Sequence, residues 1–105
     1  MIWKIVYTQK AKQDLDDVYY YIANVLCEPG IAKTYISNIM KEICGLNQLP
    51  MRYRIYDDEP WKSIGLRVMP VKNYLVFYLP IDEDKTVNIV RIMYAGRDIS
   101  NQLEE

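Results

Sequence analysis

Arginines and one tyrosine near the C-terminal end of the chain have side chains that could take part in phosphate chemistry. Arg91 and Arg97 each lie three residues from Tyr94, and Arg67 lies on an earlier predicted strand. Guanidinium groups bind phosphate oxygens through paired hydrogen bonds, and a tyrosine hydroxyl can carry a proton. Such a cluster suits a phosphate, an RNA or a protein target. The alternative is structural: Arg97 pairs with Asp98 or with a helix acid, and Tyr94 packs under the helices.

Trp61 and Lys62 form a second candidate contact point, on a stretch without a clear periodic pattern. An indole ring beside an ammonium group could stack on a base or on a partner protein. The alternative is that Trp61 anchors this loop in the core. Together with Arg67, Arg91 and Arg97, these two residues make up the expected surface for target or partner binding.

The first predicted helix carries runs of tyrosines and of acids. Tyr19–Tyr21 are consecutive, so they must point to different sides of the helix and at least one must be exposed or pack on another element or partner. Asp14, Asp16 and Asp17 fall largely off the apolar stripe of the same helix. We expect these acids to be solvated, with no metal bound to them.

The composition indicates one folded domain that covers residues 1–105. Half of the residues are hydrophobic and only four are glycine, which is typical of a globular protein. The chain has no histidine, and Cys27 and Cys44 do not form a CxxC pair. We therefore expect no metal, no cofactor, and reduced, half-buried cysteines, with a disulfide between the two as the alternative. No apolar run reaches the ~20 residues of a membrane span and no signal peptide is visible, so a cytoplasmic location is expected.

The net charge of −1 conceals an uneven distribution. Acidic residues gather at 57–59, at 82–84 and at the last two positions, whereas basic residues are spread along the predicted sheet. A basic sheet face that binds an anion is therefore compatible with the nearly neutral sum. The alternative is a solvated surface of mixed charge.

The first half of the chain has the pattern of one strand followed by two helices. Residues 2–7 alternate and are rich in β-branched and aromatic side chains, which predicts a strand, and Thr8 can cap the helix after it. Apolar spacings of three and four then predict a helix that ends near Cys27 and, after the break at 28–30, a second helix. The first stripe consists of Ala11, Leu15, Val18, Ile22 and Val25, and the second of Ala32, Tyr35, Ile36, Ile39, Met40, Ile43 and Leu46.

The second half predicts three strands in a row. Residues 66–71 and 74–79 flank Lys72–Asn73, which we expect to form a two-residue hairpin turn, and residues 86–94 are expected to make the last strand. The nearly unbroken apolar run from 74 to 79 is typical of a central strand covered on both faces. Residues 51–64 show no period and are predicted to form an exposed loop with, at most, a short extended piece.

This order of elements predicts an α+β domain. We expect an N-terminal strand, a helical hairpin and then a three-stranded antiparallel meander, with both helices packed on one face of a twisted, antiparallel sheet. The other face of the sheet would be exposed. Basic side chains on that face could meet a polyanion.

Two stretches in the second half carry a family resemblance. The first, Gly65 to Tyr78, reads Gly-Leu-Arg-Val-Met-Pro-Val-Lys-Asn-Tyr-Leu-Val-Phe-Tyr, and the second, Val90 to Asp98, reads Val-Arg-Ile-Met-Tyr-Ala-Gly-Arg-Asp. With the short first strand and a hairpin that has Tyr21-Ile22 late in its first helix, they resemble the RelE/ParE superfamily of bacterial toxins. The resemblance covers nearly the whole chain. It implies the toxin of a type II toxin–antitoxin module, neutralised by a small antitoxin in a hetero-oligomer.

The superfamily divides into two activities with different targets. RelE-like toxins enter the ribosomal decoding site and cut messenger RNA, whereas ParE-like toxins poison DNA gyrase. A chain of the first kind would be a metal-independent endoribonuclease. A chain of the second kind would be a protein-binding inhibitor.

The residues that RNA cleavage requires are partly present. Cleavage needs a base for the 2′-hydroxyl, cations for the phosphorane and an acid for the leaving oxygen. If the chain is a nuclease, the catalytic candidates are Arg67, Arg91, Tyr94 and Arg97. However, the chain lacks histidine, and Leu75 stands where the family often has an arginine after the tyrosine of the middle strand.

The phrases Leu-Arg-x-x-Pro-Val-x-x-Tyr-x-x-Phe-Tyr and Arg-x-x-Tyr-x-x-Arg-Asp are closer to the ParE-like branch. We therefore expect growth arrest through inhibition of DNA gyrase, with ribosome-dependent cleavage of messenger RNA as the alternative. The expected partners are a cognate antitoxin and either gyrase or the ribosome with its messenger RNA. From the resemblance, we expect the antitoxin to occupy the sheet or the helical hairpin with an extended or helical C-terminal segment.

Overall fold

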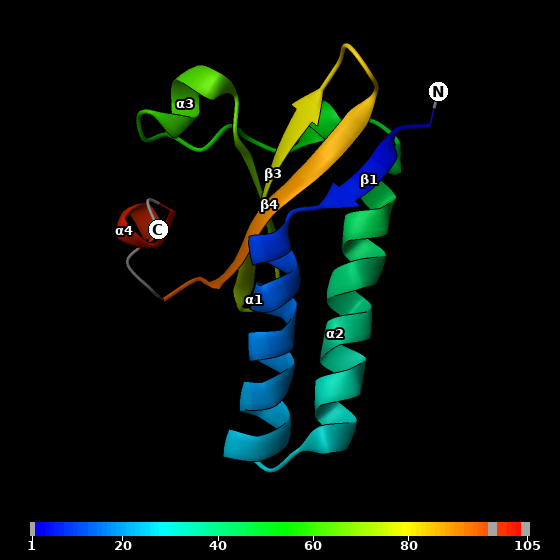
Figure 1. Cartoon of the computed structure of the whole chain (residues 1–105), viewed down its shortest axis with the longest axis vertical. Helices are drawn as coiled ribbons and strands as arrows, with labels where there is room; N and C mark the ends of the chain where they lie inside the picture. Colours follow the sequence, from blue (N-terminus) through cyan, green and yellow to red (C-terminus); the bar gives the residue numbers. More distant parts are fainter. Residues whose placement is uncertain (1, 97–98, 104–105) are drawn as a thin grey trace.

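A computed structural model of the chain describes residues 2–96 and 99–103 (Figure 1). The elements are β1 (Lys4–Tyr7), α1 (Gln9–Tyr20), the π-helical turn η1 (Tyr21–Val25), α2 (Pro29–Cys44), the 3₁₀ turns η2 (Gly45–Asn47) and η3 (Pro50–Arg52), α3 (Trp61–Ile64), β2 (Arg67–Val71), β3 (Tyr74–Ile81), β4 (Thr86–Tyr94) and α4 (Ile99–Leu103). This order confirms the predicted strand, helical hairpin and three-stranded meander. The stretch predicted as an exposed loop also contains two short helices, η3 and α3.

The strands form one mixed sheet in the order β1-β4-β3-β2. The pairs β2–β3 and β3–β4 are antiparallel, as predicted, and the turn between β2 and β3 lies at Lys72–Asn73. β1 runs parallel to β4, in a register that places Lys4 opposite Thr86 and Tyr7 opposite Ile89. The expectation of an antiparallel sheet throughout is therefore wrong for β1. The alternation of β1 identifies a strand, but it does not specify the neighbour or the direction.

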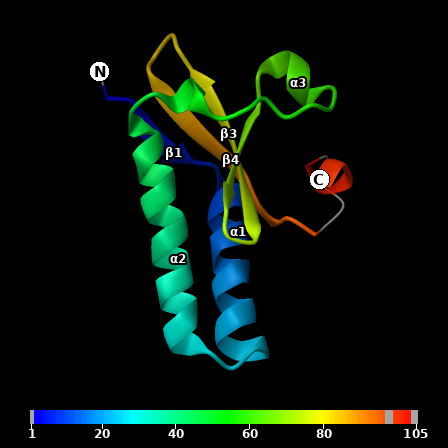
Figure 2. The ribbon, with the colours of Figure 1, turned by 180° about the vertical axis from the view of Figure 1, so that it is seen from behind.

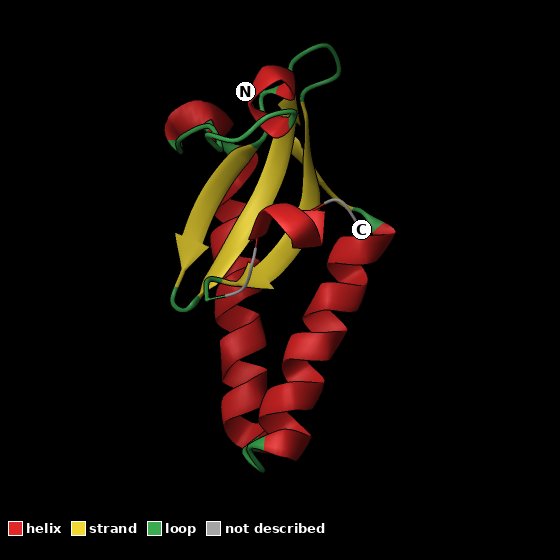
Figure 3. Ribbon diagram, turned by 90° about the vertical axis from the view of Figure 1, so that its left-hand side faces the viewer, coloured by secondary structure: helices red, strands yellow, loops and turns green. Residues whose placement is uncertain are grey.

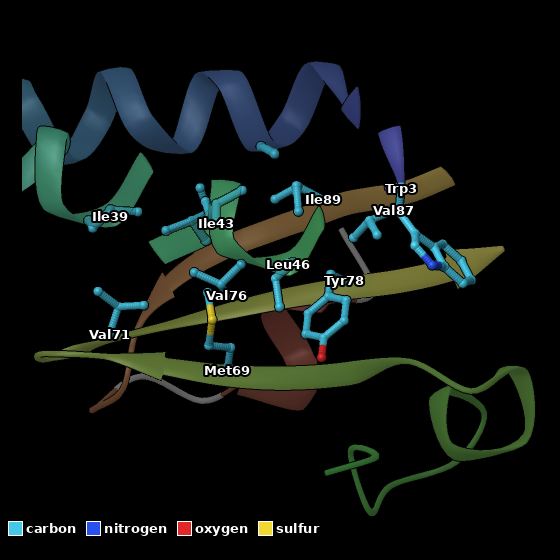
Figure 4. Packing of buried hydrophobic residues seen from close by; sticks show 12 residues of the cluster. Trp3, Ile39, Ile43, Leu46, Met69, Val71, Val76, Tyr78, Val87 and Ile89 are labelled. Carbon is cyan, nitrogen blue, oxygen red and sulfur yellow. The ribbon is translucent and has the colours of Figure 1, made fainter. Parts of the chain in front are cut away.

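The helical hairpin of α1 and α2 covers one face of the sheet (Figures 1 and 2). Side chains from the sheet, from α1 and α2, and from the segments next to β1 and α2 meet there in the larger apolar cluster, shown in Figure 4. Its labelled members are Trp3, Ile39, Ile43, Leu46, Met69, Val71, Val76, Tyr78, Val87 and Ile89. This cluster fixes the hairpin against the sheet because apolar area removed from water is the main stabilising contribution to folding.

The opposite face of the sheet is apolar and covered rather than basic and exposed. Phe77 and Met93 form a second cluster there, with Trp61 of α3 and with Ile99 and Leu103 of α4 packed against it. Figure 3 shows the short helix α4 in front of the strands on this side. The expectation of an exposed basic face is wrong because β3 is apolar on both sides. The prediction of a central strand covered on both faces is confirmed.

The hairpin extends beyond the sheet at its far end (Figure 1). Val25 closes the first predicted stripe but is 57% exposed, and Met40 of the second stripe is also exposed. These side chains are exposed because the apolar stripes of the two helices extend beyond the end of the sheet. Cys27 and Cys44 are free thiols, but both are exposed, so the expectation that they are half-buried is wrong.

Candidate functional site

A groove of about 840 Å³ lies between the helical hairpin and the last residues of β4. One wall comes from the later turns of α1 and from η1, and the other from Arg91–Tyr94 of β4, with Tyr35 and Tyr74 also in the lining. Several apolar side chains on the helical wall are solvent-exposed. They are Tyr20, Tyr21, Val25 and Leu26. We call this feature the hairpin groove.

The outer edge of β4 is covered by the backbone and side chain of Thr8, in the segment that leads into α1. β1 pairs with β4 only as far as Ile89. Beyond that point the Thr8 N–H donates to the Ile89 carbonyl at 3.0 Å, and the Thr8 hydroxyl donates to the Val90 carbonyl at 2.9 Å. The same hydroxyl accepts the Ala11 N–H at 3.1 Å, which confirms Thr8 as the helix cap.

The carboxylate of Asp14 caps the next part of the same β4 edge. Its Oδ2 accepts the Ile92 N–H at 2.9 Å and the Arg91 Nε–H at 2.8 Å, while Oδ1 accepts Arg91 Nη2 at 3.0 Å. The side chains of Arg91 and Asp14 are 12% and 11% exposed. The expectation that Asp14 is solvated is therefore wrong. Its carboxylate is buried because it accepts hydrogen bonds from the Arg91 guanidinium and from the backbone of β4. Asp16 and Asp17 are exposed, as predicted.

A β-bulge sets the position of Arg91. Phe77 pairs with Arg91 and Tyr78 pairs with Ile89, which leaves Val90 as the extra residue on β4. Bulges redirect side chains near strand edges. Arg91, one of the predicted site residues, is thus held within the protein by Asp14. Its side chain also borders the hairpin groove.

Tyr94 lies in the same groove and is 48% exposed. Its ring meets Tyr74 edge-to-face at 5.7 Å, and Tyr74 meets Tyr35 of α2 in the same way at 5.7 Å. A Cβ added at Gly96 would come within 2.7 Å of the Tyr94 ring, so Gly96 leaves room for that ring. The three tyrosines form a row from α2 across β3 to β4.

Arg67 lies on β2, which β3 separates from β4. Its Nη1 donates to the Met51 carbonyl at 3.0 Å and to the Tyr53 carbonyl at 2.6 Å. The neighbouring Tyr78 hydroxyl donates to the Pro50 carbonyl at 2.6 Å. Burial raises the pKa of Tyr78 to about 12, and the nearby positive charge of Arg67 opposes this rise. Arg67 thus holds the loop that follows α2.

Trp61 and Lys62 lie on α3, beside the second apolar cluster. The half-buried Trp61 ring contacts Tyr56 at 6.0 Å, and Tyr56 contacts Phe77 edge-to-face at 5.3 Å. Lys62 Nζ lies 3.3 Å from the carboxylate of Asp57, and both of these side chains are more than half exposed. The indole anchors this segment on the sheet, while the lysine remains at the surface.

The structure therefore brings two of the candidate residues together, Arg91 and Tyr94, and places the others elsewhere. Arg67 lies at the far strand of the sheet, and Trp61–Lys62 lie with α3 on the opposite face from the hairpin. Arg97 lies outside the described residues.

Sequence reasoning missed Asp14 and the exposed helical wall of the groove. A signal for the wall was present, because the consecutive tyrosines required at least one exposed ring; Tyr20 is 62% and Tyr21 is 49% exposed. The signal for Asp14 was weaker. It lies four residues before Val18 and therefore on the same side of the helix, but its pairing with Arg91 depends on tertiary structure.

The part of the chain that the structure describes has no group of His, Cys, Asp and Glu side chains arranged to hold a metal ion. Within the same residues, no helix has the length and apolar character needed to cross a membrane.

Residues 5–99 match a family model described as the ParE toxin of the type II toxin–antitoxin system parDE. No curated protein sequence matched the chain. Among solved structures, the chain is similar to one from the chromosomal ParDE system of P. aeruginosa, with 22% identity, a TM-score of 0.74, and 89% of this chain and 96% of that chain covered.

Two further structures share the fold at low sequence identity. A toxin–antitoxin complex, RelBE2 from Mycobacterium tuberculosis, has 21% identity and a TM-score of 0.66, with 90% of this chain and 92% of that chain covered. A mutant of E. coli toxin RelE in the free state has 11% identity and a TM-score of 0.64, with 99% and 92% covered.

Proposed function

We propose that this chain, which belongs to the ParE toxin family of type II toxin–antitoxin systems, arrests growth by inhibiting DNA gyrase. In this proposal the toxin binds gyrase as a protein and cuts no nucleic acid. A cognate antitoxin keeps it inactive in a hetero-oligomer.

The observation that carries the proposal is that three of the described arginines, Arg52, Arg67 and Arg91, bind acceptors inside the protein. Arg91 binds Asp14, Arg67 binds two loop carbonyls, and Arg52 binds two carbonyls of the segment after α2, those of residues 45 and 48. A nuclease of this kind needs preorganised cations aimed at a phosphorane. Because these arginines hold parts of the fold together, they support a structural role for the cations rather than a role in cleavage.

The apolar character of the outer sheet face supports the same conclusion. Leu75, which stands where the family often has an arginine, packs in the second apolar cluster with Met93 and Phe77. α3 and α4 supply the side chains that cover this face. An RNA phosphate backbone is bound mainly by Lys and Arg, and this face offers apolar side chains instead.

The shape and exposed apolar lining of the hairpin groove support its role as the antitoxin-binding site. The structurally similar RelBE2 protein was solved as a toxin–antitoxin complex. In this chain the exposed Tyr21 and Val25 line the groove together with Tyr94. An amphipathic segment that places apolar side chains between α1 and β4 would remove these three side chains from water.

Cleavage of ribosome-bound messenger RNA is the second candidate function. One observation favours it: the half-exposed Tyr94 lines the same groove as Arg91. A tyrosine in that position could carry a proton for the attacking 2′-hydroxyl or the leaving oxygen.

Expression of the toxin without antitoxin, followed by two readouts, separates the candidates. We expect induction of the DNA-damage response and no new messenger 5′ ends. Codon-phased 5′ ends without a supercoiling defect would exclude gyrase inhibition. In that case Tyr94→Phe and Arg97→Ala should each abolish cutting, because each would remove a group that the nuclease reaction uses. A harmless toxin would contradict both candidates.

A further inference from the structure

The loop that follows α2, residues 49–55, combines unusual backbone geometry with unusual exposure. Leu49 has φ 51° and ψ 56°, in the left-handed region that favours glycine, and its side chain is 76% exposed. Met51 is 44% and Ile55 39% exposed. A branched apolar residue in this conformation gains no burial in return, so packing within the chain does not explain Leu49.

Hydrogen bonds from side chains fix this loop to the rest of the protein. Tyr78 donates to the Pro50 carbonyl at 2.6 Å, and Arg67 donates to the carbonyls of Met51 and Tyr53. The Arg52 side chain ties the loop back to the end of α2 through the Gly45 carbonyl at 3.2 Å.

Backbone bonds hold the far end of the loop. The Val68 N–H donates to the Arg54 carbonyl at 3.0 Å, and the Tyr56 N–H donates to the Leu66 carbonyl at 2.8 Å. The exposed side chains are thus presented on a rigid backbone, which lowers the entropy cost of binding.

The charge of the loop differs from that of the whole chain. The stretch from Leu49 to Tyr56 contains Arg52 and Arg54 and no acid, whereas the chain as a whole carries a net charge of −1. Arg54 is exposed and lies next to the exposed Ile55. A complementary surface would therefore combine an apolar pocket with carboxylates around it.

We propose that the 49–55 loop is a preorganised contact loop for the protein target, with Leu49 inserted into an apolar pocket that acidic side chains surround. This inference rests on the proposed function, in which the target is gyrase. Single-stranded nucleic acid is usually held by stacking on exposed aromatic rings. The exposed uncharged side chains of this loop are aliphatic, and Tyr53 is half-buried beneath the Arg52 guanidinium at 5.4 Å, which favours a protein surface.

The test compares the binding of wild-type toxin and variants to purified gyrase holoenzyme. Leu49→Gly suits the left-handed backbone, so its melting temperature should equal or exceed that of wild type while its affinity for gyrase falls at least about tenfold. Arg54→Glu should weaken binding to a similar degree. Ile64→Ser is the matched control, because Ile64 is 57% exposed but lies outside the loop.

The possible outcomes separate the loop from the proposed function. If wild type binds gyrase and Leu49→Gly binds equally well, the loop proposal is wrong and gyrase inhibition stands. If wild type does not bind gyrase, both proposals are wrong. Equal losses in Leu49→Gly and Ile64→Ser would indicate a general surface effect and would also overturn the loop. If the toxin bound RNA fragments through this loop instead of gyrase, the assignment to a protein target would be wrong.

Discussion

The carboxylate of Asp14 lies between the guanidinium of Arg91 and the backbone N–H of Ile92, and it accepts hydrogen bonds from both. One acid on α1 thereby neutralises a nearly buried cation and covers the part of β4 that β1 does not reach. An unprotected strand edge is a template for pairing with another chain. This carboxylate therefore contributes both to the stability of the hairpin and to the protection of the sheet.

Removal of Asp14 should be strongly destabilising. In Asp14→Ala the Arg91 guanidinium and the Ile92 N–H would both lose an acceptor, and loss of one member of a buried ion pair costs about 3–5 kcal/mol. Urea unfolding followed by circular dichroism measures the change. Asp16→Ala, on the exposed side of the same helix, is the control and should change the free energy of unfolding by less than about 0.5 kcal/mol. Equal effects of the two substitutions would contradict the structural role of Asp14.

The pH dependence of stability should reflect Tyr78. Burial raises the pKa of Tyr78 to about 12 in the folded protein, from the ordinary value of 10.0. Between these values the unfolded chain releases this proton while the folded protein keeps it. The contribution of Tyr78 is therefore fully present below pH 10 and is lost as the pH rises toward 12, by about 2–3 kcal/mol in total.

Tyr78→Phe isolates this contribution from those of the other tyrosines and of the lysines. At neutral pH the variant should be less stable by about 1–2 kcal/mol, because the Pro50 carbonyl loses its donor. Above pH 10 its stability should fall less steeply than that of wild type. Parallel pH profiles for the two proteins would argue against the raised pKa.

Arg67 should control the rigidity of the 49–55 loop. Replacement with Met removes the bonds to the Met51 and Tyr53 carbonyls but keeps a long apolar stem. Trypsin cleaves after arginine, so the loop carries its own cleavage sites at positions 52 and 54. Limited trypsin digestion should cut Arg67→Met in this loop several times faster than wild type. The exposed Lys72 offers the control Lys72→Met, which should leave the loop resistant.

Affinity for the antitoxin should depend on the hairpin groove. Tyr21→Ala and Val25→Ser alter exposed side chains, so each should leave the melting temperature nearly unchanged. Each should weaken antitoxin binding by about tenfold or more, measured by calorimetry, because apolar area is no longer buried. Ile31→Ser serves as control, since Ile31 is exposed on α2 but does not line the groove. If all three variants bound the antitoxin equally well, the antitoxin-binding site would lie elsewhere.

The elements of the fold were predictable because their apolar patterns are local. Spacings of three and four gave both helices, and the alternation and the run at β3 gave the meander. The parallel pairing of β1 was not predictable, because the strand's own pattern is the same whichever neighbour it joins. The run at β3 predicted a strand covered on both faces, but α3 and α4, which cover the outer face, were missed because they are short.

The candidate site was predictable only in part. Arg91 and Tyr94 lie on one strand, but their separation of three residues places their side chains on opposite faces of a regular strand. Both line the groove because the Arg91 side chain reaches Asp14 of α1, a contact that spacing does not reveal. The partner of Arg91 is 77 residues away, and the acceptors of Arg67 are loop carbonyls, which carry no sequence signature. Spacing therefore indicates where cations lie along the chain, but whether a cation is already bound depends on tertiary structure.

The most direct measurement of the central claim is DNA supercoiling by purified gyrase as the toxin is titrated in. Inhibition should rise with toxin concentration and disappear when the cognate antitoxin is added first. Messenger RNA on purified ribosomes should remain intact at the same concentrations. Undisturbed supercoiling together with codon-phased cleavage on the ribosome would contradict the account and would identify the chain as a nuclease.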